Sequence, residues 1–181
     1  MGRVLVTCAG GFTGLHLAER LARGGHELHG LVHDAGDALH PLYAAMHGAD
    51  LRDLAALERV IAVVRPEAVV HLAAIAFVAH GDAAELYSTN ILGTRNLLQA
   101  LATAQERPRA VLVASSANIY GNRREGVLDE GMTPEPANDY GITKLACEQL
   151  ARLYADRLPI ITVRPFNYTG RGQSEAFLIP K

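Results

Sequence analysis

Tyr140 and Lys144 lie four residues apart in Tyr140-Gly141-Ile142-Thr143-Lys144, a segment whose pattern predicts a helix. This spacing places both side chains on one helical face, one turn apart. A lysine ammonium beside a phenol favours the phenolate, so we expect a lowered tyrosine pKa and a proton donor and acceptor usable near neutral pH. The pair also fits an ordinary exposed helix face, so its chemistry depends on what lies beside it.

A glycine-rich segment near the N-terminus predicts a phosphate-binding turn. The apolar run 3–6 suits a buried parallel strand, and it leads into Thr7-Cys8-Ala9-Gly10-Gly11-Phe12-Thr13-Gly14. Leu15, Leu17, Ala18, Leu21 and Ala22 then recur at helical spacing. A strand, a glycine turn and a helix N-terminus together aim free backbone N–H groups at a phosphate. A purely steric role for the glycines is the alternative, since tight connections favour glycine.

Two later apolar runs also end in polar residues. The run 111–114 is followed by Ser115 and Ser116, and the run 159–164 is followed by Pro165, Phe166 and Asn167. Ligands of a doubly wound sheet bind at the carboxyl ends of its strands. We therefore expect Ser116 to face the same crevice as the glycine turn, although a helix or turn cap would also explain a serine there.

Composition limits the class of protein. The chain has 181 residues, 49% of them hydrophobic, and a formal net charge of −2, which predicts a globular protein without a nucleic-acid footprint. No apolar run is long enough for a membrane helix. The two cysteines are far apart, which suggests a reducing, cytoplasmic setting. None of the eight histidines has the spacing of a metal site, so no metal is expected.

Alternating strand and helix patterns predict an α/β fold, with a Rossmann-like doubly wound parallel sheet in three α/β/α layers. We expect strands near 3–7, 27–32, 67–72, 110–115 and 159–164, and helices near 12–24, 53–64, 82–104 and 137–156. The first strand should be central. Asp53 is the expected N-cap of the second helix, and Pro136 is expected in the first turn of the last. Residues 1–181 are expected to form one dinucleotide-binding domain.

Taken together, these motifs resemble the extended short-chain dehydrogenases/reductases, the NAD-dependent epimerase/dehydratase family of nucleotide-sugar enzymes. The matching segments follow the family's order: 7–14, Asp50-Leu51, 71–74, Asn90 with Gly93-Thr94, 115–121, 140–144 and 164–170. Segments 26–32 and 164–180 are most similar to the branch of GDP-mannose 4,6-dehydratases and GDP-4-keto-6-deoxymannose reductases. The resemblance implies a nicotinamide cofactor and a nucleotide-sugar substrate.

The resemblance also implies roles for individual residues. Tyr140 would exchange the hydroxyl proton, Lys144 would bind the nicotinamide ribose and tune Tyr140, and Ser116 would hold the substrate oxygen. The implied cofactor-binding residues are Gly11, Phe12, Thr13, Gly14, His33, Asp34, Asp50, Leu51, Leu72, Ala73, Ala74, Tyr140, Lys144 and Pro165, and the implied substrate-binding residues are Asn118 and Asn167. NAD is the expected cofactor because Asp34 could reach the ribose, while NADP stays possible because His33 could meet a 2′-phosphate.

Asn118 discriminates between the reactions of this family. The dehydratases carry an acidic residue at this position, and an amide cannot act as a general acid or base. The resemblance therefore implies a 4-keto reductase or an epimerase. Two alternatives stay open: an enzyme similar to GDP-mannose 4,6-dehydratase, and a truncated dinucleotide-binding module with little or no turnover.

Two departures from the family pattern concern Cys8 and the C-terminus. Cys8 occupies the position of the first glycine in the family's turn motif, so it should weaken cofactor binding unless Gly10 provides the flexible position instead. A reactive thiol is the alternative, because a helix N-terminus lowers thiol pKa. The chain ends at Lys181, where the family's substrate lobe would begin. Without that lobe we expect an open, partly apolar surface near Tyr120, Phe166, Tyr168 and Phe177. We also expect a homodimer through the helices near 82–104 and 137–156.

Overall fold

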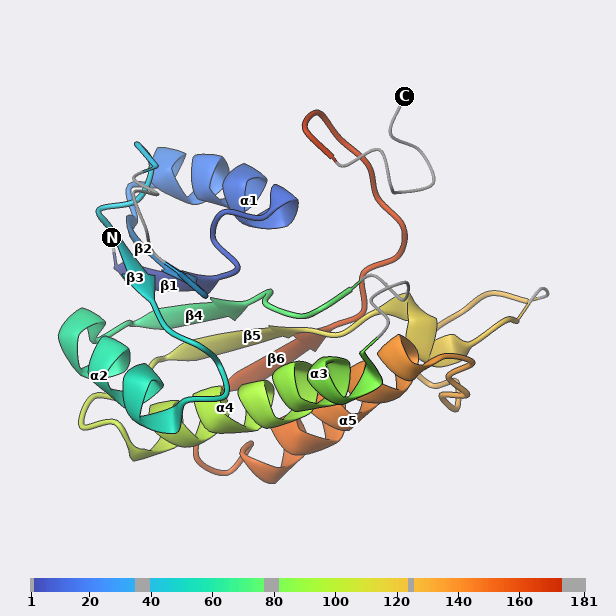
Figure 1. Cartoon of the computed structure of the whole chain (residues 1–181). Coiled ribbons are helices and arrows are strands. Elements are labelled where there is room, and N and C mark those ends of the chain that lie inside the picture. Colours follow the sequence, from blue (N-terminus) through green and yellow to red (C-terminus); the bar gives the residue numbers. More distant parts are fainter. Residues whose placement is uncertain (1, 35–39, 77–81, 124–125, 174–181) are drawn as a thin grey trace.

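The computed structural model describes residues 2–34, 40–76, 82–123 and 126–173. Its centre is a parallel sheet with the strand order β3-β2-β1-β4-β5-β6 (Figure 1). The strands are β1 (Arg3–Thr7), β2 (Glu27–Val32), β3 (Ala45–Gly48), β4 (Ala68–His71), β5 (Ala110–Ala114) and β6 (Ile160–Val163). Each neighbouring pair is parallel, and β1 lies inside the sheet between β2 and β4. The predicted doubly wound α/β fold with a central first strand is confirmed.

Helices cover both faces of the sheet (Figure 1). Helix α1 (Phe12–Arg23) lies on one face, and helices α2 (Leu54–Val64), α4 (Gly93–Thr103) and α5 (Asp139–Leu153) lie on the other. Three short elements complete the described chain: α3 (Ala83–Tyr87), the π-helical turn η1 (Ser88–Leu92) and the 3-10 turn η2 (Ala117–Tyr120). None of the described helices is long and apolar enough to cross a membrane.

The unbroken apolar run in β1 follows from burial on both faces of the sheet. Val4 and Val6 belong to the hydrophobic cluster beneath α1, whereas Leu5 belongs to the larger cluster beneath α2, α4 and α5. Successive side chains of a strand point to opposite faces, so a strand covered by helices on both sides needs apolar residues at every position. The same reasoning explains why an unbroken apolar run predicted this strand correctly.

Strand β3 was not predicted from the sequence. Its four residues, Ala-Met-His-Gly, include no β-branched or aromatic side chain, so local propensity gives no strand signal. The strand exists because it pairs with β2 at the edge of the sheet. The helix predicted over 82–104 is confirmed as one helical segment over 83–103, in which the π-helical turn η1, which was not predicted, joins α3 to α4.

The helix ends show which capping signals were decisive. Asp53 caps α2 as predicted, and its carboxylate accepts a hydrogen bond from the amide of Ala56 at 3.0 Å. The last helix lies where it was predicted, but the placement of Pro136 in its first turn was wrong: α5 begins at Asp139, and Asn138 caps it by accepting from the Gly141 amide at 2.8 Å. Pro136 therefore lies outside the helix. A side chain that satisfies a free amide determined this start, rather than the fixed φ of proline.

Candidate active site

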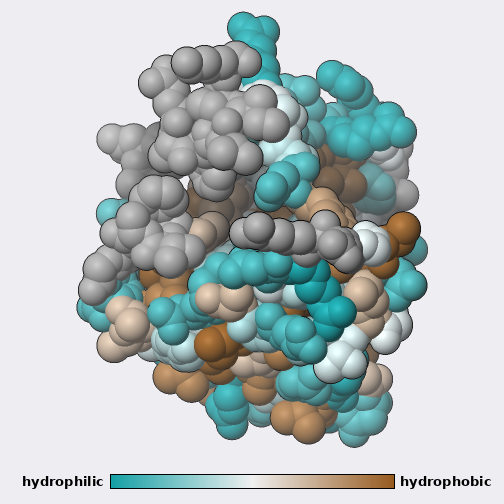
Figure 2. All heavy atoms as spheres, turned by 90° about the vertical axis from the view of Figure 1, so that its right-hand side faces the viewer, coloured by the Kyte–Doolittle hydropathy of each residue, from teal (hydrophilic) through white to brown (hydrophobic). Residues whose placement is uncertain are grey.

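The carboxyl ends of β1, β4 and β5 lie side by side at one edge of the sheet. The strand order reverses between β1 and β4, since the chain continues outward through β2 and β3 on one side and through β5 and β6 on the other. Ligands of open α/β sheets bind in the crevice at such a reversal. Figure 2 faces this side of the molecule, where hydrophilic and hydrophobic residues are intermixed. The glycine turn, residues 72–74 and Ser116 all follow these strand ends.

The glycine turn delivers the N-terminus of α1 to this crevice. Gly11 is the N-cap, and no acidic residue occupies the first helical turn. The amides of Phe12, Thr13 and Gly14 are the first of the helix and have no intrahelical acceptor, which suits an anion. A Cβ on Gly14 would lie 2.5 Å from the Cys8 carbonyl oxygen and 2.8 Å from that of Ala9. Glycine is therefore required there by the close approach of helix and strand.

Cys8 itself adopts the left-handed conformation, with φ of 56°. This costs an L-residue about 1–2 kcal/mol, so the position does call for the glycine that the chain lacks. Gly10 does not take over the turn, because its φ is not positive. Cys8 is exposed, yet partial desolvation of its thiol raises its pKa against the hydrogen bond with the Gly11 backbone, so the lowered pKa expected of a reactive thiol is not seen. A Cβ on Gly11 would lie 2.8 Å from the Cys8 sulfur, so glycine is also needed at that position.

A buried chain of hydrogen bonds joins the ends of β1 and β4. The Thr7 hydroxyl oxygen accepts from the amides of Leu72 and Ala73 at 3.0 and 2.9 Å, so its hydrogen points to His71 Nδ1 at 2.9 Å. His71 must then carry its proton on Nε2 and donate it to Thr94 Oγ1 at 3.0 Å. Burial, assisted by the charge of Lys144, lowers the pKa of His71 to about 3. His71 is therefore a neutral structural residue, and the amides of Leu72 and Ala73 are already occupied.

Ser116, Tyr140 and Lys144 meet beside this chain. Ser116 is buried at the end of β5, where its hydroxyl accepts from the Asn118 amide at 3.2 Å and lies near the Tyr140 hydroxyl. Lys144 is 5% exposed, and its ammonium lies 6.0 Å from the centre of the Tyr140 ring. Among the described residues, that ammonium donates no hydrogen bond.

The pKa of Tyr140 differs from the sequence-based expectation. Burial raises it, and the hydrogen bond from Ser116 only partly opposes that effect. Burial also lowers the pKa of Lys144, against the opposing influence of Cys147 and Glu148. The prediction of a lowered tyrosine pKa was wrong for this structure, because desolvation of the phenolate outweighs an ammonium held at ring distance.

Asn90 fixes the backbone around this group of side chains. Its amide oxygen accepts from the Ile75 amide at 2.8 Å, and its nitrogen donates to the Ile75 carbonyl at 3.1 Å and to Thr143 Oγ1 at 3.0 Å. Thr143 in turn donates to the Tyr140 carbonyl at 2.8 Å. The π-helical turn that contains Asn90 therefore ties the segment after β4 to the first turn of α5. Sequence reasoning noted Asn90 only as a family match and missed this role.

The ends of β2 and β3 carry the residues expected near an adenosine ribose. Asp50 accepts a hydrogen bond from Arg52 at 2.6 Å and lies 3.5 Å from His33 Nε2. The hydrogen bond from Arg52 is the main reason that the pKa of Asp50 falls to about 2. Leu51 is buried in the core, so only its backbone is available to a ligand. Asp34 follows His33 at the same edge but is already engaged in an interaction.

The segment after β6 passes over the start of α1 (Figure 1). Tyr168 Oη lies 2.7 Å from Thr13 Oγ1, and its ring stacks on Phe12 with 6.2 Å between centroids. Earlier in the same segment, the Pro165 carbonyl accepts from the amide of Ala117 at 2.9 Å, whereas Asn167 is exposed. The segment thereby bridges the β5 end of the crevice and the glycine turn.

Arg164 anchors the start of that segment. Its guanidinium donates to both carboxylate oxygens of Glu148 at 2.9 and 2.8 Å and to Tyr120 Oη at 2.8 Å. Glu148 is nearly fully buried, yet its pKa is lowered, because hydrogen bonds led by that of Arg164 outweigh burial. Tyr120 is also buried, which corrects its assignment to an open apolar surface; Phe166 and Tyr168 are about half exposed. Phe177 lies outside the described residues.

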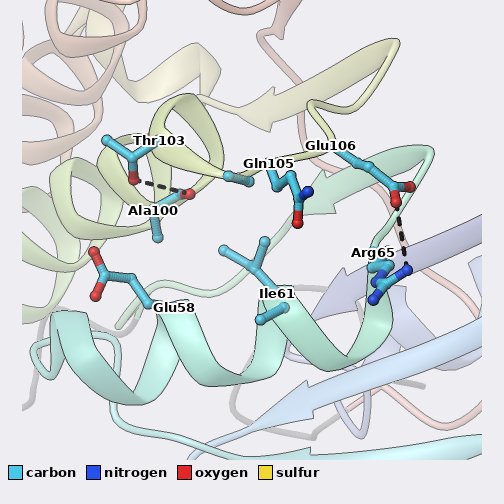
Figure 3. Close-up of a pocket in the computed structure, with 9 residues that line it drawn as sticks. Glu58, Ile61, Arg65, Ala100, Thr103, Gln105 and Glu106 are labelled. Atoms are coloured by element: carbon cyan, nitrogen blue, oxygen red, sulfur yellow. Dashed lines mark hydrogen bonds and ion pairs between the residues drawn. The ribbon is translucent and has the colours of Figure 1, made fainter.

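A pocket of about 390 Å³ lies elsewhere, between α2 and α4 (Figure 3). Its walls include Ile61 and Ala100, and an ion pair of 3.5 Å joins Arg65 to Glu106 at its rim. Helices α2 and α4 lead into β4 and β5, so this pocket lies at the amino ends of those strands, opposite the crevice. It holds none of the predicted site residues. The described residues also contain no cluster of three metal-ligating side chains.

Curated relatives of this chain include enzymes named for GDP-linked deoxysugars and others named UDP-glucose or UDP-glucuronate 4-epimerases. It is 36% identical over 132 residues to a GDP-6-deoxy-D-talose 4-dehydrogenase of Aggregatibacter actinomycetemcomitans, covering 73% of this chain and 45% of that protein. It is 34% identical over 186 residues to a GDP-6-deoxy-D-mannose reductase of Pseudomonas aeruginosa, covering 98% and 56%. The chain thus spans about half the length of the curated relatives it matches.

Solved structures agree with the fold. A putative epimerase from Burkholderia cenocepacia J2315 superposes with a TM-score of 0.88 at 50% identity, over 97% of this chain and 57% of that one. MoeE5 in complex with UDP-glucose and NAD superposes with a TM-score of 0.84 at 33% identity, over 97% and 58%. Residues 4–181 match the sequence pattern of one family. This chain belongs to the NAD-dependent epimerase/dehydratase family.

Proposed function

We propose that this chain is the dinucleotide-binding part of a nucleotide-sugar oxidoreductase of the 4-keto reductase or epimerase type. The observation that carries the proposal is the group formed by Ser116, Tyr140 and Lys144 beside the glycine turn. The serine hydroxyl lies near the tyrosine hydroxyl, and the buried lysine ammonium lies 6.0 Å from the centre of the tyrosine ring. Membership of the family and the NAD bound in MoeE5 support NAD as the cofactor, and NADP is the alternative.

The residues at the switch point fit a dinucleotide. The first amides of α1 face the crevice without an acidic neighbour, and Gly14 removes the Cβ that would collide with the turn. We assign the pyrophosphate to the amides of Gly11, Phe12, Thr13 and Gly14, with Leu72, Ala73, Ala74 and Pro165 lining the crevice. His33, Asp34, Asp50 and Leu51 surround the adenosine end. Since Arg52 already engages Asp50, the ribose contact there would compete with an existing ion pair.

A nicotinamide cofactor, when bound, would supply hydride exchange with a sugar carbon, and the residues of this chain would hold it and move the proton. Tyr140 Oη carries the proton of the reacting hydroxyl, and Ser116 Oγ holds the same oxygen in place. The Lys144 ammonium would bind the ribose hydroxyls of the cofactor and would hold a positive charge close to the Tyr140 phenol. A raised tyrosine pKa in this structure is consistent with that role, since the proton should stay on oxygen until a ligand changes the local charge.

Asn118 favours reduction or epimerisation over dehydration. Its side chain is exposed at the start of η2, two residues after Ser116, where we assign it with Asn167 to substrate binding. An amide cannot supply the acid that an elimination needs. A binding module with little turnover is the second candidate, because Cys8 strains the turn. Both candidates require a dinucleotide site. We also propose a reducing, cytoplasmic setting, which suits the two free cysteines.

Calorimetric titration with NAD(H) and NADP(H) tests the proposal. We expect Tyr140→Phe to bind the dinucleotide as tightly as the wild type, because the ring and its packing are retained. Lys144→Met should weaken binding by about tenfold or more, because charged hydrogen bonds of about 1.5–3 kcal/mol are lost. Equal loss in both variants would mean that the tyrosine is structural, and no binding by the wild type would refute a dinucleotide site.

Turnover separates the two candidates. A GDP-linked 4-keto-6-deoxyhexose is mixed with NADH, and the absorbance of the reduced nicotinamide is followed. Residues 1–181 alone should turn over slowly, because binding energy from the nucleotide end of the substrate is needed to orient the reacting carbon. Tyr140→Phe should abolish the rate that remains. A rate unaffected by this substitution would favour the binding module and exclude the assigned proton transfer.

A further inference from the structure

Tyr43 belongs to no motif, yet its side chain reaches the glycine turn from the connection between β2 and β3. It is 7% exposed and packs in the hydrophobic cluster beneath α1. Its hydroxyl donates to the carbonyl of Ala9 at 3.3 Å and to that of Gly14 at 3.1 Å. One phenolic hydrogen is therefore shared between a residue of the turn and a residue of the first helical turn.

The turn that Tyr43 contacts is unusual because Cys8 holds a left-handed backbone without being glycine. Strained residues of this kind persist only where their surroundings determine the conformation. Apart from Tyr43, the backbone hydrogen bonds to the turn within the described residues include that of Gly11 to the Cys8 carbonyl at 3.0 Å and that of Ala9 to the Leu31 carbonyl at 3.4 Å. The second is long, so the phenol supplies a substantial part of the restraint.

We propose that Tyr43 is a positioning residue for the dinucleotide-binding turn, where its hydroxyl clamps Ala9 to Gly14 and so holds Cys8 in the left-handed conformation. The inference rests on the proposed function for its ligand, although the clamp itself can be measured without one. Burial, with the Cys8 thiol as a smaller cause, raises the pKa of Tyr43 to about 12, so the phenol stays a donor throughout the neutral range. A preorganised turn presents its amides to the pyrophosphate without a further ordering cost.

The test is a double-mutant cycle between Tyr43→Phe and Cys8→Gly, with NAD(H) affinity as the first readout. Tyr43→Phe keeps the ring and removes only the clamp, so we expect about tenfold weaker binding, or about 1.4 kcal/mol. Cys8→Gly should tighten binding, because glycine adopts the conformation without strain and removes the thiol. In the Cys8→Gly background the Tyr43→Phe loss should fall to about threefold or less, because the backbone no longer needs the restraint.

A matched control separates positioning from general stability. Tyr154 is also buried, and its hydroxyl donates to Gln99 Oε1 at 3.0 Å. Gln99 belongs to α4, which covers the face of the sheet opposite α1. Tyr154→Phe should lower the melting temperature to a similar degree and leave NAD(H) affinity unchanged. Equal affinities of wild type, Tyr43→Phe and Tyr154→Phe would overturn the proposal, as would identical Tyr43→Phe losses in the two backgrounds.

Amide hydrogen exchange of the unliganded protein provides the second readout. The Gly11 amide, bonded to the Cys8 carbonyl, should exchange about tenfold faster in Tyr43→Phe, with little change in Tyr154→Phe. Unchanged Gly11 protection would overturn the clamp regardless of any ligand. If the wild type binds neither NAD(H) nor NADP(H) while Gly11 protection depends on Tyr43, the proposed function fails and the clamp stands.

Discussion

His71 should make the stability of this protein fall as the pH drops below about 6.5. Its ring is 3% exposed and neutral between Thr7 and Thr94, and burial lowers its pKa to about 3. In the unfolded chain a histidine titrates near pH 6.5. Below about pH 6.5 the unfolded chain therefore binds a proton that the folded chain excludes. The free energy of unfolding decreases as the pH is lowered, until the pH reaches the pKa of the folded state.

The size of this effect follows from the two pKa values. Between pH 8 and pH 5, protonation of the unfolded chain alone lowers the free energy of unfolding by about 2 kcal/mol. His71→Asn removes the titrating group but keeps an amide oxygen that can accept from Thr7. The variant should be less stable than wild type at pH 8, because Thr94 loses its donor, and the difference should shrink by about 2 kcal/mol at pH 5.

Urea denaturation followed by circular dichroism at pH 8, 7, 6 and 5 provides the measurement. His33→Asn is the matched control, because the His33 side chain is 77% exposed and takes no part in the buried chain of hydrogen bonds around His71. It should follow the wild-type dependence on pH. If wild type and His71→Asn lose stability in parallel from pH 8 to pH 5, the argument that His71 is excluded from protonation is refuted.

Two more outcomes follow from the packing of α5. Glu148→Gln should lower the free energy of unfolding by about 3 kcal/mol in urea denaturation, because it leaves the guanidinium of Arg164 without its charge partner. The control is Glu19→Gln on the surface of α1, which should change the free energy of unfolding by less than about 0.5 kcal/mol. A loss below about 1 kcal/mol for the buried pair would contradict this. Light scattering at micromolar concentration should show the proposed dimer through α4 and α5, because Leu153 on α5 is 70% exposed. Leu153→Asp should dissociate it, and a monomeric wild type would count against the proposal.

The site was partly visible in the sequence because its backbone elements are local. The turn 7–14 combines a strand, glycines and a helix start within a few residues, and the spacing of Tyr140 and Lys144 is a property of one helix. Ser116 was predicted from its place at a strand end, and the resemblance to a family implied its role. Neither source indicated Tyr43 or the tie from Asn90 to Thr143, because those contacts join segments 29 or more residues apart.

Electrostatics was the part that sequence reasoning judged wrongly. Helical spacing correctly placed Lys144 beside Tyr140, but it could not say how deeply either side chain is buried. Burial reverses the expected shift of the Tyr140 pKa, and it also keeps His71 neutral and structural. Desolvation depends on every element packed around a group, so a motif alone cannot supply it.

By itself, the sequence determined the elements whose signal is short-range. Periodicity located five of the strands and the main helices, and Asp53 located the start of α2, since apolar spacing and capping act within a few residues. Tertiary structure alone decided the edge strand β3, the π-helical turn around Asn90 and the left-handed conformation of Cys8. Each of these is unfavourable or neutral locally and exists because distant partners stabilise it, which no window of neighbouring residues can reveal.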